Sequence, residues 1–255
     1  MSKETNIGNN DTQQDMLISL MGSSQADFLT EQDYREIDEF VKQIKITNSN
    51  LVLTYGDYYQ RNIANLYSFL SEVILVNNES LSDINDLEKS ILRIIDTFIE
   101  FSSREVDSAS VRERSIKDKR RILVLKSKLE SIRLDSTIAT EKLRKSYSEM
   151  FDFFRIIYKY IIAGEKKSAQ IKKILKDYDD NKESIIKTPE DYYFVTNCNK
   201  SFIKRLQSLK DTLASCQLYL IQIKQQIEKN ENAISICEKL IYTTIPAFEQ
   251  SVTLH

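Results

Sequence analysis

The fold is decided by residues 188–245, which read TPEDYYFVTNCNKSFIKRLQSLKDTLASCQLYLIQIKQQIEKNENAISICEKLIYTTI. Apolar residues recur along this stretch at alternating steps of four and three, a period typical of a helix that keeps one seam against a partner helix. The seam comprises Phe202, Leu206, Leu209, Leu213, Cys216, Leu220, Ile223, Ile227, Ile234, Cys237 and Ile241, with Asn230 as its one polar member. We therefore expect one long helix from the N-cap Thr188 to about Ile245, where Pro246 ends or kinks it.

Asn230 allows two interpretations. A polar residue buried in such a seam fixes the register of the helices at some cost in stability. At the edge of the seam, the same side chain would simply face water.

A second long helix is predicted from about Ala109 to Gly164, and its pattern continues to Leu175. Its seam comprises Ile122, Leu125, Leu129, Ile132, Ser136, Ala139, Leu143, Ser146, Met150, Phe154, Ile157 and Ile161. One additional step of four after Met150 resembles the stutter of a coiled coil. The polar turn at 179–187 would fold the two helices into an antiparallel hairpin, although a dimer could use the same heptads.

Three shorter helices are predicted before this hairpin. The first runs from Glu31 to about Lys45 behind Thr30 as N-cap, and the others cover about 51–76 and 81–103, with Asn77, Asn78 and Ser80 at the break between them. Gly56 falls inside the second helix. Because Gly costs about 1 kcal/mol relative to Ala in an exposed helix, we expect another helix to approach closely there.

The composition supports an all-α protein. The chain has 255 residues with 4 Gly, 2 Pro, 29% charged residues and a net charge of −2, which suits long solvated helices and gives no indication of nucleic-acid binding. We predict a disordered or weakly ordered tail over residues 1–28. Residues 29–255 are predicted to form an elongated α-helical domain, coiled-coil-like, with the shorter helices packed on the hairpin.

The sequence contains few residues in patterns that would indicate catalysis. The only His is His255, which excludes Ser-His-Asp, Cys-His and His-ligated metal sites within the chain. Asp177, Asp179 and Asp180 lack the Gly turn of an EF-hand loop, and no phosphate-binding Gly-rich loop is present. Cys216 and Cys237 lie on the seam and are interpreted as core residues. We therefore expect no enzyme activity, cofactor or metal.

The sequence also bears on location. No apolar run reaches the roughly 18 residues of a membrane-spanning helix, the N-terminus lacks the features of a signal peptide, and the odd number of cysteines fits a reducing compartment. We expect a cytoplasmic protein, with the inner face of the membrane as a peripheral alternative.

Residues 111–128, VRERSIKDKRRILVLKSK, form the strongest local charge feature, which we call the basic segment. It predicts a docking face for an anionic membrane surface or an acidic partner. The alternative is a solvated helix surface of mixed charge. The cationic candidates are Arg112, Arg114, Lys117, Lys119, Arg120, Arg121, Lys126 and Lys128.

Two aromatic clusters could pack in the core or form exposed partner sites. For the first, we favour packing around the stutter. The clusters are Phe151, Phe153, Phe154, Tyr158 and Tyr160, and Tyr192, Tyr193 and Phe194.

Three segments resemble the TelA (KlaA) toxic-anion-resistance family: ITNSNLVLTYG at 46–56, FFRIIYKYIIAGEKK at 153–167 and IYTTIPAFEQ at 241–250. The resemblance covers about residues 30–255 and implies that the family's C-terminal region is lacking. It also implies an all-helical cytoplasmic protein that confers resistance to tellurite, other toxic anions or envelope stress. TerD-like or membrane-bound Ter-type proteins are the partners implied, and no catalytic residues carry over.

The function that we expect is that of a non-enzymatic scaffold for protein–protein interaction in such a resistance system. Two alternatives remain: a peripheral membrane-binding helical protein, and a coiled-coil component of a phage or secretion apparatus.

Overall fold

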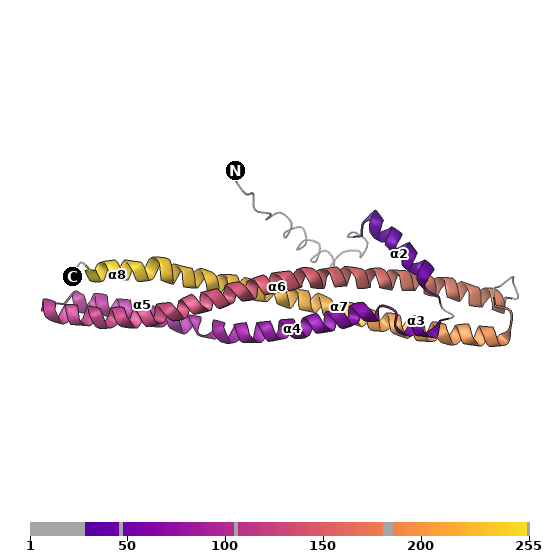
Figure 1. Cartoon of the computed structure of the whole chain (residues 1–255), viewed down its shortest axis with the longest axis horizontal. Helices are drawn as coiled ribbons and strands as arrows, with labels where there is room; N and C mark the ends of the chain where they lie inside the picture. The colour runs from indigo at the N-terminus through magenta and orange to yellow at the C-terminus, as the bar shows by residue number, and fades with distance from the viewer. Residues whose placement is uncertain (1–28, 46–47, 105–106, 181–185, 254–255) are drawn as a thin grey trace. The chain divides into compact units, whose positions relative to one another are not determined.

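A computed structural model describes residues 29–45, 48–104, 107–180 and 186–253, and every regular element in these ranges is a helix (Figure 1). The predicted all-α class is therefore confirmed. The predicted tail, residues 1–28, lies outside the described residues. The chain divides into two compact units: unit 1 comprises Met1–Gly56 and Ile157–Lys210, and unit 2 comprises Asp57–Ile156 and Asp211–His255.

Both units are built on the two long helices, α6 (Ser108–Asp179) and α7 (Pro189–Lys239). Within each unit, residue numbers on α6 fall as those of their partners on α7 rise, so the helices run antiparallel, as predicted. The contacts are Met150 with Cys216 (3.7 Å), Arg144 with Glu231 (2.5 Å) and Arg133 with Glu238 (3.9 Å) in unit 2, and Ser168 with Asn199 (3.4 Å) and Glu165 with Lys210 (2.6 Å) in unit 1.

The seam of α7 follows the prediction up to Ile223 and in part beyond it. Asn230, Cys237 and Ile241 are buried, as predicted. Ile227 and Ile234 are only half-buried, whereas Gln226 and Ala233, one residue earlier, are buried. An α-helix has 3.6 residues per turn, so a stripe with a 3.5-residue period drifts around it by about 20° per heptad. At these two positions the buried residue is therefore the one before the predicted seam residue.

In unit 2, α4 (Asp57–Ser82) and α5 (Ile84–Ser102) precede α6. The prediction that Asn77–Ser80 separates these two helices is wrong, because α4 continues to Ser82. One hydrophobic core joins α5 to α6 and to the C-terminal helices. Its buried members are Ile84, Leu87, Ile91, Phe98, Ile122, Leu129, Ile132, Ala233, Cys237, Leu240, Ile241, Ile245 and Phe248.

Asn77 remains helical because its side chain has a buried partner on α7. Its Nδ2 donates to Asn230 Oδ1, which also accepts from Gln226 Nε2 at 3.2 Å. Gln226 Nε2 donates in addition to Asn78 at 3.0 Å. Asn230 is fully buried, so the interpretation of a polar residue within the seam is confirmed.

Of the two outcomes predicted for Pro246, an end or a kink of the helix, the structure excludes the end. A π-helical turn, η1 (Leu240–Thr244), follows α7 and leads into α8 (Ile245–Thr253), in which Pro246 is the second residue. Pro has no N–H and its ring would meet the carbonyl of residue i−4. The wider turn, in which the Ile245 N–H donates to the Leu240 carbonyl, accommodates this residue while the chain stays helical.

In unit 1, α2 (Glu31–Gln43) begins with the predicted Thr30 cap, and the short helix α3 (Ser49–Leu53) follows. Gly56 is not inside a helix, contrary to prediction. It lies between α3 and α4 with φ of +71°, in the left-handed region. The predicted close approach is nevertheless present, because a Cβ at Gly56 would lie 3.0 Å from both Leu209 methyl carbons.

We predict that Gly56→Ala lowers the free energy of unfolding by about 1–3 kcal/mol, because Ala is strained at positive φ. Asn tolerates this region better, while its Cβ meets Leu209 in the same way. Gly56→Asn should therefore cost less than Gly56→Ala in urea unfolding. Equal losses would mean that contact with Leu209, and not φ, sets the cost.

The buried amides generate a second prediction. Asn230→Leu alone should destabilise the protein by about 1–3 kcal/mol, because it leaves the buried Asn77 Nδ2 without its acceptor. Asn77→Leu alone should cost less, because Asn230 Oδ1 still accepts from Gln226 Nε2. The double variant should lose much less than the sum, since it removes both polar groups. The exposed Asn65→Leu serves as control, and additive losses in a double-mutant cycle would contradict the coupling.

Candidate docking surfaces

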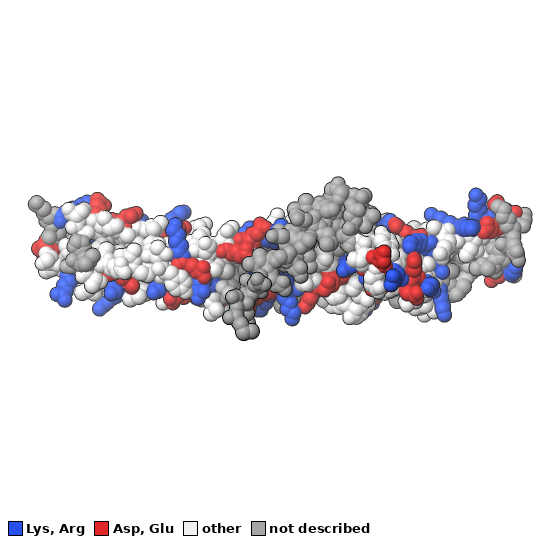
Figure 2. All heavy atoms as spheres, turned by 90° about the horizontal axis from the view of Figure 1, so that it is seen from above, with Lys and Arg blue, Asp and Glu red and all other residues white. Residues whose placement is uncertain are grey.

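The cations of the basic segment are distributed around α6. Because an α-helix turns once per 3.6 residues, side chains so close in sequence cannot all share one face. Arg114 and Lys126 are half-buried, and the other six candidates are exposed. On the face drawn in Figure 2, Lys and Arg are interspersed with Asp and Glu. Six of the eight cations form two groups, an inward group that contacts Asp118 and an outward group that does not; Lys126 and Lys128 belong to neither.

The inward group surrounds Asp118, whose side chain is fully buried. Arg114 Nε donates to Asp118 Oδ2 at 2.7 Å, and Arg121 Nη1 lies 3.5 Å from Oδ1. The Arg114 guanidinium also lies 5.8 Å from the centre of the Phe101 ring at the end of α5. A buried carboxylate requires such compensation, so these two arginines have a structural role within unit 2.

The outward group comprises Arg112, Lys117, Lys119 and Arg120. Among the described residues, no carboxylate forms an ion pair with any of these four cations. Their charges are therefore available to a partner.

Exposed apolar side chains lie on the same outward side of α6. Ile116, Leu123, Leu134 and Ile138 are 48%, 44%, 55% and 43% exposed, and we call them the outer stripe. Their spacing places them within about 60° of one another around the helix, away from the buried Ile122 and Leu129. These four residues are out of phase with the seam in the sequence, and this signal of an exposed stripe is absent from the predictions above.

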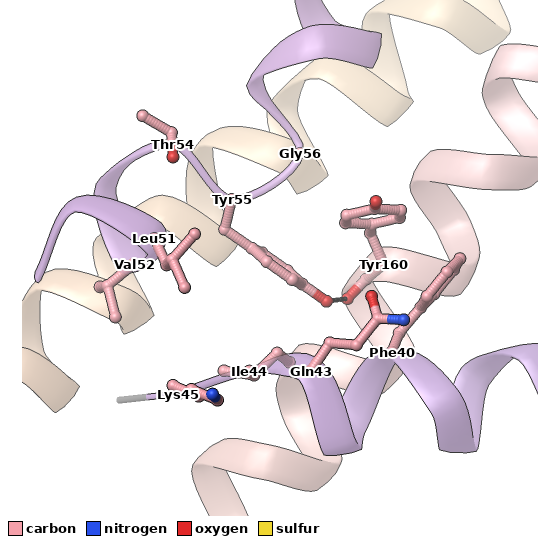
Figure 3. A pocket seen from close by; sticks show the side chains of 10 residues that line it. All are labelled: Phe40, Gln43, Ile44, Lys45, Leu51, Val52, Thr54, Tyr55, Gly56 and Tyr160. Atoms are coloured by element: carbon pink, nitrogen blue, oxygen red, sulfur yellow. Dashed lines mark hydrogen bonds between the residues drawn. The ribbon is translucent and has the colours of Figure 1, made fainter. Parts of the chain in front are cut away.

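Unit 1 contains a pocket of about 200 Å³ (Figure 3). Phe40 and Ile44 contribute one wall, Val52 and Tyr55 another, and Tyr160 of α6 a third. Two of the segments that carry the family resemblance, 46–56 and 153–167, therefore meet at this pocket. Sequence analysis gave no reason to bring them together.

Hydrogen bonds fix the pocket's geometry. The Tyr55 hydroxyl donates to the Tyr160 carbonyl at 2.7 Å, and Arg205 Nε donates to the Tyr55 carbonyl at 2.7 Å. Burial raises the pKa of Tyr55, so the phenol stays protonated and keeps its donor. The rings of Phe40 and Tyr55 lie 4.6 and 4.9 Å from that of Tyr160. The pocket is smaller than most small-molecule sites, and its size suits one apolar side chain.

Ion pairs attach α2, which carries Phe40, to α6. Lys159 is buried, with Nζ 3.2 Å from Asp33 and 2.5 Å from Glu36. Lys166 lies 3.0 Å from Asp38. Mainly because of its hydrogen bond with Lys159, the pKa of Glu36 is below its ordinary value.

The aromatic clusters have different outcomes. Phe151, Phe154 and Tyr158 are buried, which confirms the packing prediction for the first cluster. Tyr193 and Phe194 are exposed. With Leu53 they border a second hollow in unit 1, of about 290 Å³.

The three thiols are buried, which confirms the core interpretation of Cys216 and Cys237. Burial raises the pKa of Cys216 to about 12 and that of Cys198 and Cys237 above the ordinary value. These thiols are therefore poor nucleophiles at neutral pH. Within the described ranges, no group of three or more His, Cys, Asp or Glu residues could hold a metal ion, and no helix is long and apolar enough to cross a membrane.

The described chain is thus an all-α protein whose long helices pack on one side and present cationic and apolar side chains on the other. A family model described as "Toxic anion resistance protein (TelA)" matches residues 37–255, and the chain belongs to this family. The resemblance is confirmed, and membership associates the chain with resistance to toxic anions, tellurite included.

No curated protein matches the chain. Among solved structures, a computationally designed three-helix bundle is similar to this chain at 13% sequence identity. The alignment covers 88% of this chain and 96% of the designed chain. Its TM-score of 0.35 is too low to support an argument about the fold.

The Glu36–Lys159 contact predicts a pH dependence. Because the pKa of Glu36 is lowered in the folded state, its stabilising contribution is complete above its ordinary value of 4.5 and is lost as the pH falls through the lowered value. Glu36→Gln should remove part of the acid sensitivity of unfolding between about pH 5 and 3. Glu39→Gln is the matched control, because Glu39 pairs with Lys42 of the same helix. Identical pH profiles for Glu36→Gln and the native protein would contradict the assignment.

Proposed function

We propose that this protein is a non-enzymatic helical scaffold of a toxic-anion resistance system, which binds an acidic protein partner along the outward side of α6 in unit 2. The observation that carries the proposal is the outer stripe together with the cations beside it. Four large apolar side chains are about half exposed along one side of a helix whose other side is buried. Large apolar side chains that recur on one exposed side of a helix favour an interaction site there.

The chemistry of the outward side specifies the partner. Ile116 and Leu123 are spaced to pack against an apolar stripe on a second helix. Arg112, Lys119 and Arg120 lie beside them, and carboxylates on the partner would meet these cations. An amphipathic helix with acidic flanks fits both requirements. The apolar contacts would supply most of the affinity, and the charges would supply specificity and a faster association.

The resemblance to the family implies the class of partner. TerD-like and membrane-bound Ter-type proteins are the proposed partners, and the proposed location is the cytoplasm, extending to the inner face of the membrane. The absence of catalysis is part of the proposal. It is supported by the polar groups that the fold uses for itself, such as Asp118 between two arginines and Lys159 between two acids.

An anionic membrane could use the same cations and apolar side chains. The two occupants differ in what they require. A membrane responds mainly to the number of positive charges, whereas a partner helix also requires the spacing of the outer stripe.

The proposal is tested by affinity purification from the native host with solubilised membranes, followed by mass spectrometry. Arg112, Lys119 and Arg120 are changed together to Glu in one variant, and Leu123 and Leu134 to Ser in another. Each rim ion pair contributes about 0.2–1 kcal/mol, and each reversal adds repulsion. Both variants should therefore lower recovery of a Ter-type partner roughly tenfold or more.

The matched control reverses Lys172, Lys173 and Lys176, which are exposed on α6 within unit 1, and it should recover the partner normally. Equal recovery by all forms would overturn the proposal. Loss of phosphatidylglycerol-vesicle binding in the Glu variant alone, without any Ter-type partner, would favour the membrane instead.

A further inference from the structure

A groove of about 760 Å³ lies between α5 and α6 in unit 2, separate from the outer stripe. Three guanidinium groups line it: Arg93 from α5, and Arg114 and Arg121 from α6. The hydroxyl-bearing Ser90 and Thr97 also contribute, and the remaining lining is apolar. The question is which groups compensate the positive charges of these three arginines.

The charge of these arginines is only partly compensated. Asp118 is paired with both Arg114 and Arg121 and can neutralise one positive charge. Among the described residues, no carboxylate forms an ion pair with Arg93, and no carboxylate lines the groove. The groove therefore carries a surplus of about two positive charges beside apolar walls.

Asp118 also orients one of the donors. Its buried carboxylate accepts a hydrogen bond from Arg114 Nε at 2.7 Å, and Arg121 Nη1 lies 3.5 Å from its other oxygen. Each guanidinium has five N–H donors, so several remain on Arg114 and Arg121 after these contacts. Thr97 uses its proton on the Arg93 carbonyl at 2.5 Å, whereas the exposed Ser90 can still donate. The groove thus presents oriented, charged donors and few acceptors.

We infer that this groove binds a small, multiply charged oxyanion, of the class that includes tellurite, arsenate and phosphate. Guanidinium forks match the paired oxygens of such ions. The groove is larger than one oxyanion, and water would bridge the donors that do not reach it directly. Binding here does not depend on a protein partner, so the site adds a ligand-binding role to the proposed scaffold.

The test is isothermal titration of the full chain with tellurite, arsenate and phosphate at fixed ionic strength, with chloride as the reference anion. Arg93→Ala and Arg121→Ala should each weaken oxyanion binding by about tenfold, the effect of removing a charge-assisted pair. Arg93→Lys should bind with intermediate affinity, because it keeps the charge and loses the fork. Circular dichroism verifies that each variant folds.

Arg112→Ala and Arg120→Ala are the matched controls, since both cations are exposed on α6 in the outward group. They should leave the affinity within about twofold, as expected for exposed charges away from the ligand. The same two positions distinguish this inference from the docking proposal, which requires them. Absence of heat with the native chain at millimolar oxyanion, or equal losses in the control variants, would overturn the inference. Binding to phosphatidic-acid vesicles without binding of the free ions would overturn it in favour of a lipid headgroup.

Discussion

The antiparallel packing of α6 on α7 constrains the remainder of the structure. Each helix buries one stripe of its surface in this contact, so the shorter helices of each unit must cover the apolar side chains that remain. In unit 2, Ile91 and Phe98 of α5 join Ile122 and Leu129 of α6 in one core. In unit 1, Gly164 lets α7 approach so closely that a Cβ there would lie 2.2 Å from a Leu206 methyl carbon. The packing of α6 on α7 thus determines which side chains remain exposed on the surface.

Packing of apolar stripes alone would permit several registers, and buried polar groups distinguish among them. The Asn77–Asn230 pair is satisfied only when α4 and α7 have one alignment, as with polar residues buried in coiled-coil seams. Lys159 has the same effect on α2, because a buried ammonium is stable only between Asp33 and Glu36. Such groups add little net stability, but they make every other arrangement costly.

Much of this architecture could be predicted from the sequence, because long periodic segments report directly on burial. The seam of α6 was predicted through Met150 and Phe154, and Thr30 was predicted as the N-cap of the first helix. The errors have a common cause in tertiary contacts, which single-sequence patterns do not contain. Asn77 suggested a helix end, yet its partner is 153 residues away. Pro246 suggested another end, but a π-helical turn accommodates it.

The candidate surfaces illustrate the same limit for function. A run of cations is visible in the sequence, but its division into groups depends on which side of α6 is buried. Asp118 is one acid among many until its burial shows that Arg114 and Arg121 compensate it. The remaining outward cations then coincide with Ile116 and Leu123, which the seam does not use. The proposed function therefore depends on the surface that the helix pair leaves uncovered, and the same fold with other residues there would suit other partners.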